Sequence, residues 1–290
     1  VADAPTLSVS PASGTEDNSV ALSISTALTD TDGSETLSVT ITGVPAGASL
    51  SAGTHNPDGS WTLLPGQLSG LTLSPPANWS GVFNLTVTAT SAENGTTANT
   101  QGILPVTIGG VADVPTLTVT PATGTEDNPV SLTISSALVD TDGSETLSVQ
   151  ISGLPVGASL SAGIHNPDDS WTLSAAQLTG LTLIPPANWS GIANLSVTAT
   201  SSENGTTASQ SATLPVTVTG IADTPNLSVV AASGNEDTAI PLSISASLAD
   251  TDGSETLGIR VTGVPSGASL SAGTLNGDGS WSLTAAQLTG

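Results

Sequence analysis

The sequence contains no cysteine, methionine or tyrosine, one phenylalanine and one cation, Arg260. Without cysteine the chain forms no disulfide and offers no thiol for catalysis, so its stability has to come from other interactions. Because no run of about 18 apolar residues is present, we expect no transmembrane helix. We also find no signal peptide at Val1 and expect an internal fragment of a longer protein.

Charge of one sign dominates the chain. It carries 24 carboxylates against its single cation, for a formal net charge of −23. Such a chain repels nucleic acid and anionic membrane surfaces, so we expect neither as a partner. Like charges at this density also oppose folding unless something neutralises them.

The sequence repeats with a period of 110 residues, and roughly 79 of 110 aligned positions are identical between the first two units. A self-similarity of this kind is typical of a tandem array. We therefore predict repeats over residues 1–110 and 111–220 and an incomplete third repeat over 221–290. We expect the neighbouring repeats of the same chain to be its main protein partners and the chain to be a monomer.

The carboxylates follow the same register. Only Asp169 lies outside the pattern. The recurring positions of the first repeat are Asp3, Glu16, Asp17, Asp30, Asp32, Glu35, Asp58 and Glu93. Carboxylates placed only for solubility would be scattered, so the recurrence indicates a positional role.

Apolar residues alternate with polar ones throughout each repeat, as in Leu85, Val87 and Ala89. This period of two predicts half-buried strands, and no segment shows a sustained helical period. We predict seven strands, near 5–10, 19–27, 36–43, 48–52, 60–64 with 70–73, 82–90 and 97–108. A short helical turn is predicted at 174–178, and Asn94-Gly95 predicts a hairpin turn. The fold class is all-β: tandem antiparallel sandwiches, immunoglobulin-like or cadherin-like, arranged as an elongated rod.

The third repeat lacks counterparts of residues 75–110, which include the last two strands. We expect this to expose sheet edges and half of its core. Truncation, completion by strands of another chain, and interruption by an inserted domain all remain open.

Strand direction predicts that three acidic groups meet at each junction between repeats: a Glu-Asp turn at the base of one repeat, an aspartate in the linker, and an Asp-x-Asp loop of the next repeat. Such a group of carboxylates cannot stay ionised without a cation. Calcium suits it, because calcium takes 6–8 oxygen ligands in flexible geometry, whereas zinc favours histidine and cysteine. The loop from Asp30 is not an EF-hand, because its twelfth position is Ile41 and helical flanks are missing.

The predicted calcium ligands share this placement at the repeat ends. At the first junction they are Glu16, Asp17, Asp113, Asp140, Asp142 and Glu145, with Glu203 as a further candidate. At the second they are Glu126, Asp127, Asp223, Asp250, Asp252 and Glu255, and the equivalent residues at the start of the chain are Asp3, Asp30, Asp32 and Glu35.

Several other residues have simpler interpretations. We interpret Glu93 and Glu203 primarily as charges at hairpin tips, and Asp58 and Asp168 as turn residues. His55 and His165 belong to surface turns, because the third repeat has Leu275 at that position. The repeated tryptophans, Trp61 and Trp79 among them, are expected to serve packing rather than sugar binding.

The junction pattern resembles the inter-domain calcium arrangement of cadherins. The stretches 30–37, 43–50, 71–73 and 75–81 (the last Pro-Pro-Ala-Asn-Trp-Ser-Gly) more closely resemble extender repeats of large bacterial RTX adhesins. The resemblance covers the whole chain except the missing end of the third repeat. It implies repeats rigidified by calcium that project a ligand-binding domain from the surface of a Gram-negative bacterium, for adhesion or biofilm formation. It also implies an extracellular location.

Two other functions stay open at this point. One is a calcium-dependent module that binds a glycan or a surface, and the other is an acidic halophilic repeat without specific calcium sites. We expect no enzyme, because the acidic groups recur at every junction, whereas an active site needs one unique cleft.

Overall fold

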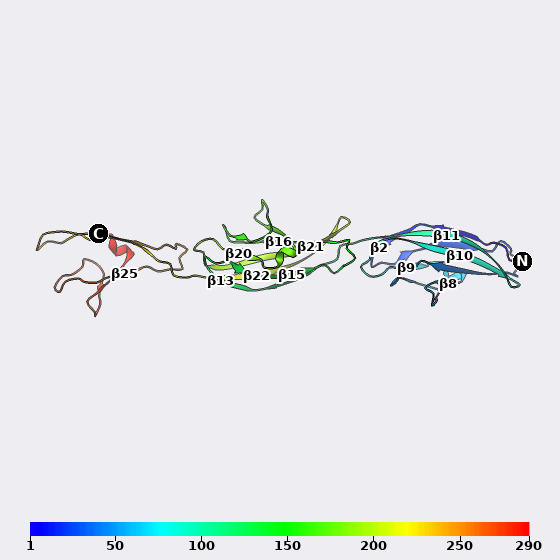
Figure 1. Cartoon of the computed structure of the whole chain (residues 1–290), viewed down its shortest axis with the longest axis horizontal. Helices are drawn as coiled ribbons and strands as arrows, with labels where there is room; N and C mark the ends of the chain where they lie inside the picture. Colours follow the sequence, from blue (N-terminus) through cyan, green and yellow to red (C-terminus); the bar gives the residue numbers. More distant parts are fainter. Residues whose placement is uncertain (290) are drawn as a thin grey trace. The chain divides into compact units, whose positions relative to one another are not determined.

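The computed structural model describes residues 1–289, which form β-strands and three short 3-10 helices (Figure 1). Within this range there is no α-helix, so the all-β prediction is confirmed. None of the helices found there is long and apolar enough to cross a membrane. The helical turn predicted at 174–178 is the 3-10 helix η2 (Ala175–Leu178).

The strands of the first repeat are short except for the last two. They are β1 (Thr6–Ser10), β2 (Ala12–Thr15), β3 (Val20–Ala21), β4 (Ser23–Ala27), β5 (Thr36–Thr42), β6 (Ser49–Leu50), β7 (Thr54–His55), β8 (Trp61–Leu63), β9 (Thr72–Ser74), β10 (Gly81–Glu93) and β11 (Thr96–Gly109), with the 3-10 helix η1 (Pro65–Gln67).

The second repeat has the same series. Its strands are β12 (Thr116–Thr120), β13 (Ala122–Thr125), β14 (Val130–Ser131), β15 (Thr133–Ala137), β16 (Thr146–Ser152), β17 (Ser159–Leu160), β18 (Ile164–His165), β19 (Trp171–Ser174), β20 (Thr182–Ile184), β21 (Gly191–Glu203) and β22 (Thr206–Thr219). The third repeat has β23 (Asn226–Val230), β24 (Ser243–Ser247), β25 (Gly258–Val261), β26 (Thr274–Leu275), β27 (Trp281–Thr284) and the 3-10 helix η3 (Ala285–Leu288).

The first repeat is a sandwich built around a six-stranded sheet in the order β2-β11-β10-β5-β8-β7. A three-stranded sheet, β3-β9-β6, and the pair β1-β4 complete it. Strands β10 and β11 form a long antiparallel hairpin, seen side by side in Figure 1. Its turn is Asn94-Gly95, where both residues have positive φ (46° and 80°), as a type I′ turn requires.

The core follows from the alternation in sequence. Leu85, Val87 and Ala89 on β10 are completely buried, whereas Thr86 and Thr88 between them face outward. Leu85 and Val87 belong to the same buried core cluster as Leu73 of β9 and Val20 of β3. Each fully buried leucine or valine stabilises the fold by about 1.5–3 kcal/mol, so this face determines the strand register.

Three details differ from the prediction. The segment 19–27 is not one strand, because β3 pairs with β9 while β4 pairs with β1. The segments 60–64 and 70–73 are separate strands in different sheets. Strands β2 and β7 were not predicted, and β2 pairs with β11 in parallel, so the sheet is not purely antiparallel.

The chain divides into two compact units. The first contains Val1–Thr118, Ser135–Val149 and Thr198–Ser211, and the second contains Val119–Ile134, Gln150–Val197 and Ala212–Gly290. Each unit therefore contains all the acidic segments of one junction. In the third repeat the apolar side chains of Leu227 and Val229 are 65% and 64% exposed, as expected for a repeat without counterparts of β10 and β11.

Candidate metal centre

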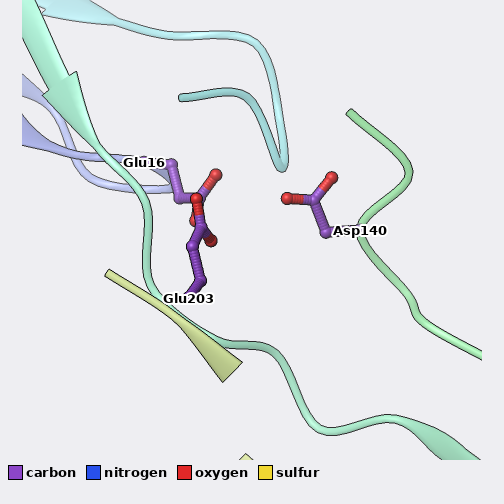
Figure 2. Close-up of side chains that lie close together, drawn as sticks. All are labelled: Glu16, Asp140 and Glu203. Carbon is purple, nitrogen blue, oxygen red and sulfur yellow. The ribbon is translucent and has the colours of Figure 1, made fainter. Parts of the chain in front are cut away.

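Three buried carboxylates meet in the first compact unit: Glu16, Asp140 and Glu203. Glu16 follows β2, Asp140 precedes β16, and Glu203 is the last residue of β21. One oxygen of each lies within 4.8 Å of the oxygens of the other two. Figure 2 shows the Glu16 and Glu203 carboxylates next to each other, with Asp140 directed toward them. We call Glu16, Asp140 and Glu203 the first acidic cluster.

The hydrogen bonds of this cluster leave oxygens unsatisfied. Glu16 Oε1 accepts a bond from the Val111 N–H (2.5 Å), and Glu203 Oε1 accepts one from the Ser80 hydroxyl (3.1 Å). The Oε2 atoms of Glu16 and Glu203 are buried and have no hydrogen-bond partner. A buried charged oxygen without a partner is strongly unfavourable, so a cation bound beside these atoms would be stabilising.

The electrostatics point the same way. Burial is the main reason why the pKa of Glu16 is raised from 4.5 to about 7. The hydrogen bond from the Val111 N–H lowers this pKa, and repulsion from Glu203 and Asp140 raises it. Burial also raises the pKa of Asp113, with Asp17 and Asp140 contributing. Without a compensating positive charge, burial therefore disfavours the ionised forms of Glu16 and Asp113.

A glutamate holds the linker at each repeat start. Glu145 Oε1 accepts a hydrogen bond from the Asp113 N–H (2.5 Å), and its Oε2 is buried without a partner. Burial, followed by the charges of Asp113, Asp140 and Glu203, raises the pKa of Glu145. Glu35 and Glu255 make the same bond to the N–H groups of Asp3 and Asp223.

The second compact unit contains an equivalent group, Glu126, Asp250 and Asp252, which we call the second acidic cluster. Glu126 and Asp250 are buried, and Asp252 is exposed. Glu126 accepts a hydrogen bond from the Ile221 N–H, as Glu16 does from Val111. Its Oε2, like that of Glu255, is buried and unpartnered. Glu126 and Asp250 correspond in the repeat register to Glu16 and Asp140, whereas Asp252 corresponds to Asp142, so the two clusters share two of their three positions.

Not every predicted ligand joins a cluster. Asp142 lies beside the first cluster, but the Ser144 and Ser80 hydroxyls and N–H groups bind its carboxylate and lower its pKa to about 2. Asp17 and Asp127 have positive φ, and each accepts a hydrogen bond from the N–H of an asparagine, Asn78 or Asn188.

The acidic residues at the start of the chain form no group of three within the described residues. Asp30 accepts a hydrogen bond from the Asp32 N–H (3.0 Å), and Asp32 accepts bonds from Ser34, which is the pattern of a local turn. Asp223 is half-buried, and its side chain accepts a hydrogen bond from Asn188 (3.0 Å).

Glu203 was predicted primarily as a hairpin-tip charge, yet it is buried in the first acidic cluster. Its place depends on Gly110, where a Cβ would lie 1.5 Å from Glu203 Oε1. The sequence signal was present, because Glu93 and Glu203 recur in register, but the close approach to a glycine in the linker requires the fold.

The metal ligands that the two clusters offer are carboxylate oxygens, which suit a hard divalent cation such as calcium. No histidine takes part: His55 and His165 lie 5.0 and 5.1 Å (ring centroids) from Trp61 and Trp171 on the β7–β8 and β18–β19 hairpins. Trp61 and Trp79 pack against the core, as predicted.

Comparison with family models finds a match within the first repeat. Residues 4–105 match the family model described as "Putative Ig domain". Together with the sheet order, this confirms the predicted immunoglobulin-like fold class. Such sandwiches recur in many cell-surface proteins and typically serve as structural, extracellular modules without enzymatic activity. A comparison with curated proteins finds no significant match.

Among solved structures, the chain is similar to Drosophila N-cadherin EC1-3, with 14% identity over 76% of this chain and 68% of that chain and a TM-score of 0.25. It is also similar to human protocadherin-24 EC1-2, with 13% identity over 68% of this chain and 86% of that chain and a TM-score of 0.32. It is similar as well to the D00-D0 domain of intimin, with 14% identity over 72% of this chain and 98% of that chain and a TM-score of 0.27.

Proposed function

We propose that this chain is a calcium-stabilised extender: an array of immunoglobulin-like repeats in the extracellular part of a Gram-negative RTX adhesin. In this role it holds a ligand-binding domain away from the cell surface for adhesion or biofilm formation. The observation that carries the proposal is the first acidic cluster, where carboxylates of two successive repeats are buried with unpartnered oxygens.

Each residue of the cluster has a definite part in this function. Glu16 belongs to the base of the first repeat, and its hydrogen bond to Val111 fixes it beside the linker. Asp140 and Glu203 come from two different segments of the second repeat. A bound calcium ion would supply the positive charge that all three carboxylates lack, so the folded, joined arrangement would be stabilised over the unfolded chain.

Burial separates this proposal from the halophilic alternative. Carboxylates that serve solubility act by being hydrated, and hydration requires exposure. Glu16, Asp140 and Glu203 are only 2%, 1% and 3% exposed. Nothing in the described residues specifically favours glycan binding, because Trp61 and Trp79 are engaged with the core.

The test is a calcium titration followed by calorimetry and small-angle X-ray scattering, with magnesium and sodium as control ions. Wild type should bind calcium selectively and become longer and stiffer at low-millimolar calcium. Glu16→Gln and Glu126→Gln should each remove binding at one junction, while Asp169→Asn, the carboxylate outside the repeat register, should change nothing. An equal response to sodium, or none to calcium, would reject the proposal.

A further inference from the structure

The loop between β9 and β10 carries hydrogen-bond donors into the first junction. We call residues Asn78, Trp79 and Ser80 the Asn-Trp-Ser loop. The Asn78 side-chain amide donates to Asp113 Oδ2 in the linker (2.8 Å). The Ser80 N–H donates to Asp142 Oδ2 (3.0 Å), and the Ser80 hydroxyl donates to Asp142 Oδ2 (3.2 Å) and Glu203 Oε1 (3.1 Å). One loop of the first repeat therefore contacts the linker and two acidic segments of the second.

The second compact unit has the same contacts. The Asn188 side-chain amide donates to Asp223 Oδ2 (3.0 Å), and the Ser190 N–H and hydroxyl donate to Asp252 Oδ2 (2.9 and 2.8 Å). The recurrence shows that the arrangement belongs to the repeat and not to one local environment.

The loop is held in a fixed conformation by its own repeat. Asn78 has φ of 50°, a left-handed conformation that asparagine tolerates better than most residues. Its N–H donates to Asp17 Oδ1 (3.0 Å). The Trp79 ring packs beside Phe83, with 5.8 Å between ring centroids, and a Cβ at Gly81 would lie only 3.0 Å from it. The donors are therefore positioned before they meet the next repeat.

These donors are neutral, so they satisfy carboxylates without any cation. The unpartnered oxygens of Glu16, Glu145 and Glu203 have no such partner. We propose that Asn78 and Ser80 are positioning residues, and that Asn188 and Ser190 have the same role at the second junction. They hold the linker aspartate (Asp113 or Asp223) and the loop of Asp142 or Asp252 in the next repeat in place before a cation binds. We call the hydrogen bonds that Asn78 and Ser80, or Asn188 and Ser190, donate across the junction the latch. The junction then consists of this latch, which needs no metal, beside a carboxylate cluster that binds one.

Hydrogen exchange in the presence of EDTA tests the latch without calcium. The readouts are the Val111 and Asp113 amides of the first junction, with Ile221 and Asp223 of the second junction as a control in the same molecule. Asn78→Gly keeps the positive φ accessible and removes only the side chain. It should accelerate exchange at the first junction by about tenfold, as loss of one hydrogen bond to a charged group implies, and leave the second junction unchanged.

Matched variants separate the latch from general destabilisation. Ser80→Ala should also accelerate amide exchange at the first junction. Ser80→Thr keeps the hydroxyl and should therefore exchange at the wild-type rate. Asn94→Gly changes another positive-φ asparagine, in the β10–β11 turn, and should have no effect at either junction. Wild-type exchange in Asn78→Gly, or equal acceleration at both junctions, would overturn the proposal.

A second experiment measures calcium binding, and it rests on the proposed function. If the latch pre-positions Asp113 and the loop of Asp142, Asn78→Gly should weaken calcium binding at the first junction by about tenfold in calorimetry. If wild type does not bind calcium, the proposed function fails, while the EDTA experiment still decides whether the latch exists. If wild type binds and Asn78→Gly binds equally well, pre-positioning is refuted.

Discussion

Replacement of Glu16 by glutamine should have opposite effects on stability with and without calcium. The change removes one charge and keeps the shape of the side chain. Glutamine Oε1 can still accept the hydrogen bond from Val111, and its amide group can donate toward Asp140 or Glu203, where the Glu16 Oε2 has no partner. In EDTA the variant should therefore be more stable than wild type.

The magnitude follows from the raised pKa of Glu16. A shift from 4.5 to about 7 means that ionising this carboxyl is less favourable in the folded protein by roughly 3 kcal/mol. Near about pH 8 the wild type carries this full penalty, and the glutamine variant avoids it, so we expect a gain of about 1–3 kcal/mol. In calcium at a thousandfold excess over the dissociation constant the wild type gains about 4.1 kcal/mol, which exceeds the whole advantage of the variant in EDTA, and the variant loses that gain at this junction.

Urea unfolding followed by tryptophan fluorescence, in EDTA and in low-millimolar calcium, measures both arms. The order of stability between wild type and Glu16→Gln should invert between the two conditions, while Asp169→Asn should follow wild type in both. Destabilisation of Glu16→Gln in EDTA would show that the cluster is satisfied without a cation. Full calcium stabilisation of the variant would show that Glu16 is not a ligand. Either result would refute the reasoning.

Three further predictions concern pH, packing and the core. In EDTA, stability should fall as pH rises from about 4.5 to about 7, because the folded protein binds the Glu16 proton more tightly than the unfolded chain, and saturating calcium should abolish this fall in a thermal-unfolding series. Gly110→Ala should displace Glu203, from which a Cβ would lie 1.5 Å, and weaken calcium binding in calorimetry, whereas Gly220→Ala, with its nearest atom at 3.4 Å, should be tolerated. Leu85→Ala should lower the free energy of unfolding by about 2–5 kcal/mol, against less than about 0.5 kcal/mol for the exposed Val82→Ala, and equal losses would show that this face is not the core.

Local patterns in the sequence were sufficient for the strands of the β10–β11 hairpin. The alternation of Leu85, Val87 and Ala89 predicts one buried face, and Asn94-Gly95 predicts the turn, because both signals act between near neighbours in the chain. The 110-residue register likewise identified the acidic positions that meet, since identical repeats bring the same groups to each junction. Glu16 and Asp140 were found in this way.

Other features depended on partners far away in sequence. The break between β3 and β4 exists because their pairing partners, β9 and β1, lie in different sheets, and β2 is a strand only through its parallel pairing with β11. The burial of Glu203 depends on contact with Gly110, and the roles of Asn78 and Ser80 depend on carboxylates 35 and 62 residues away. Sequence alone thus determined the long hairpin strands, the repeat period and five of the clustered acidic positions, because these follow from local periodicity and register. Only the tertiary structure decided which oxygens are buried, which are satisfied by neutral donors and which lack a partner, because burial and hydrogen bonding depend on which distant segments come together.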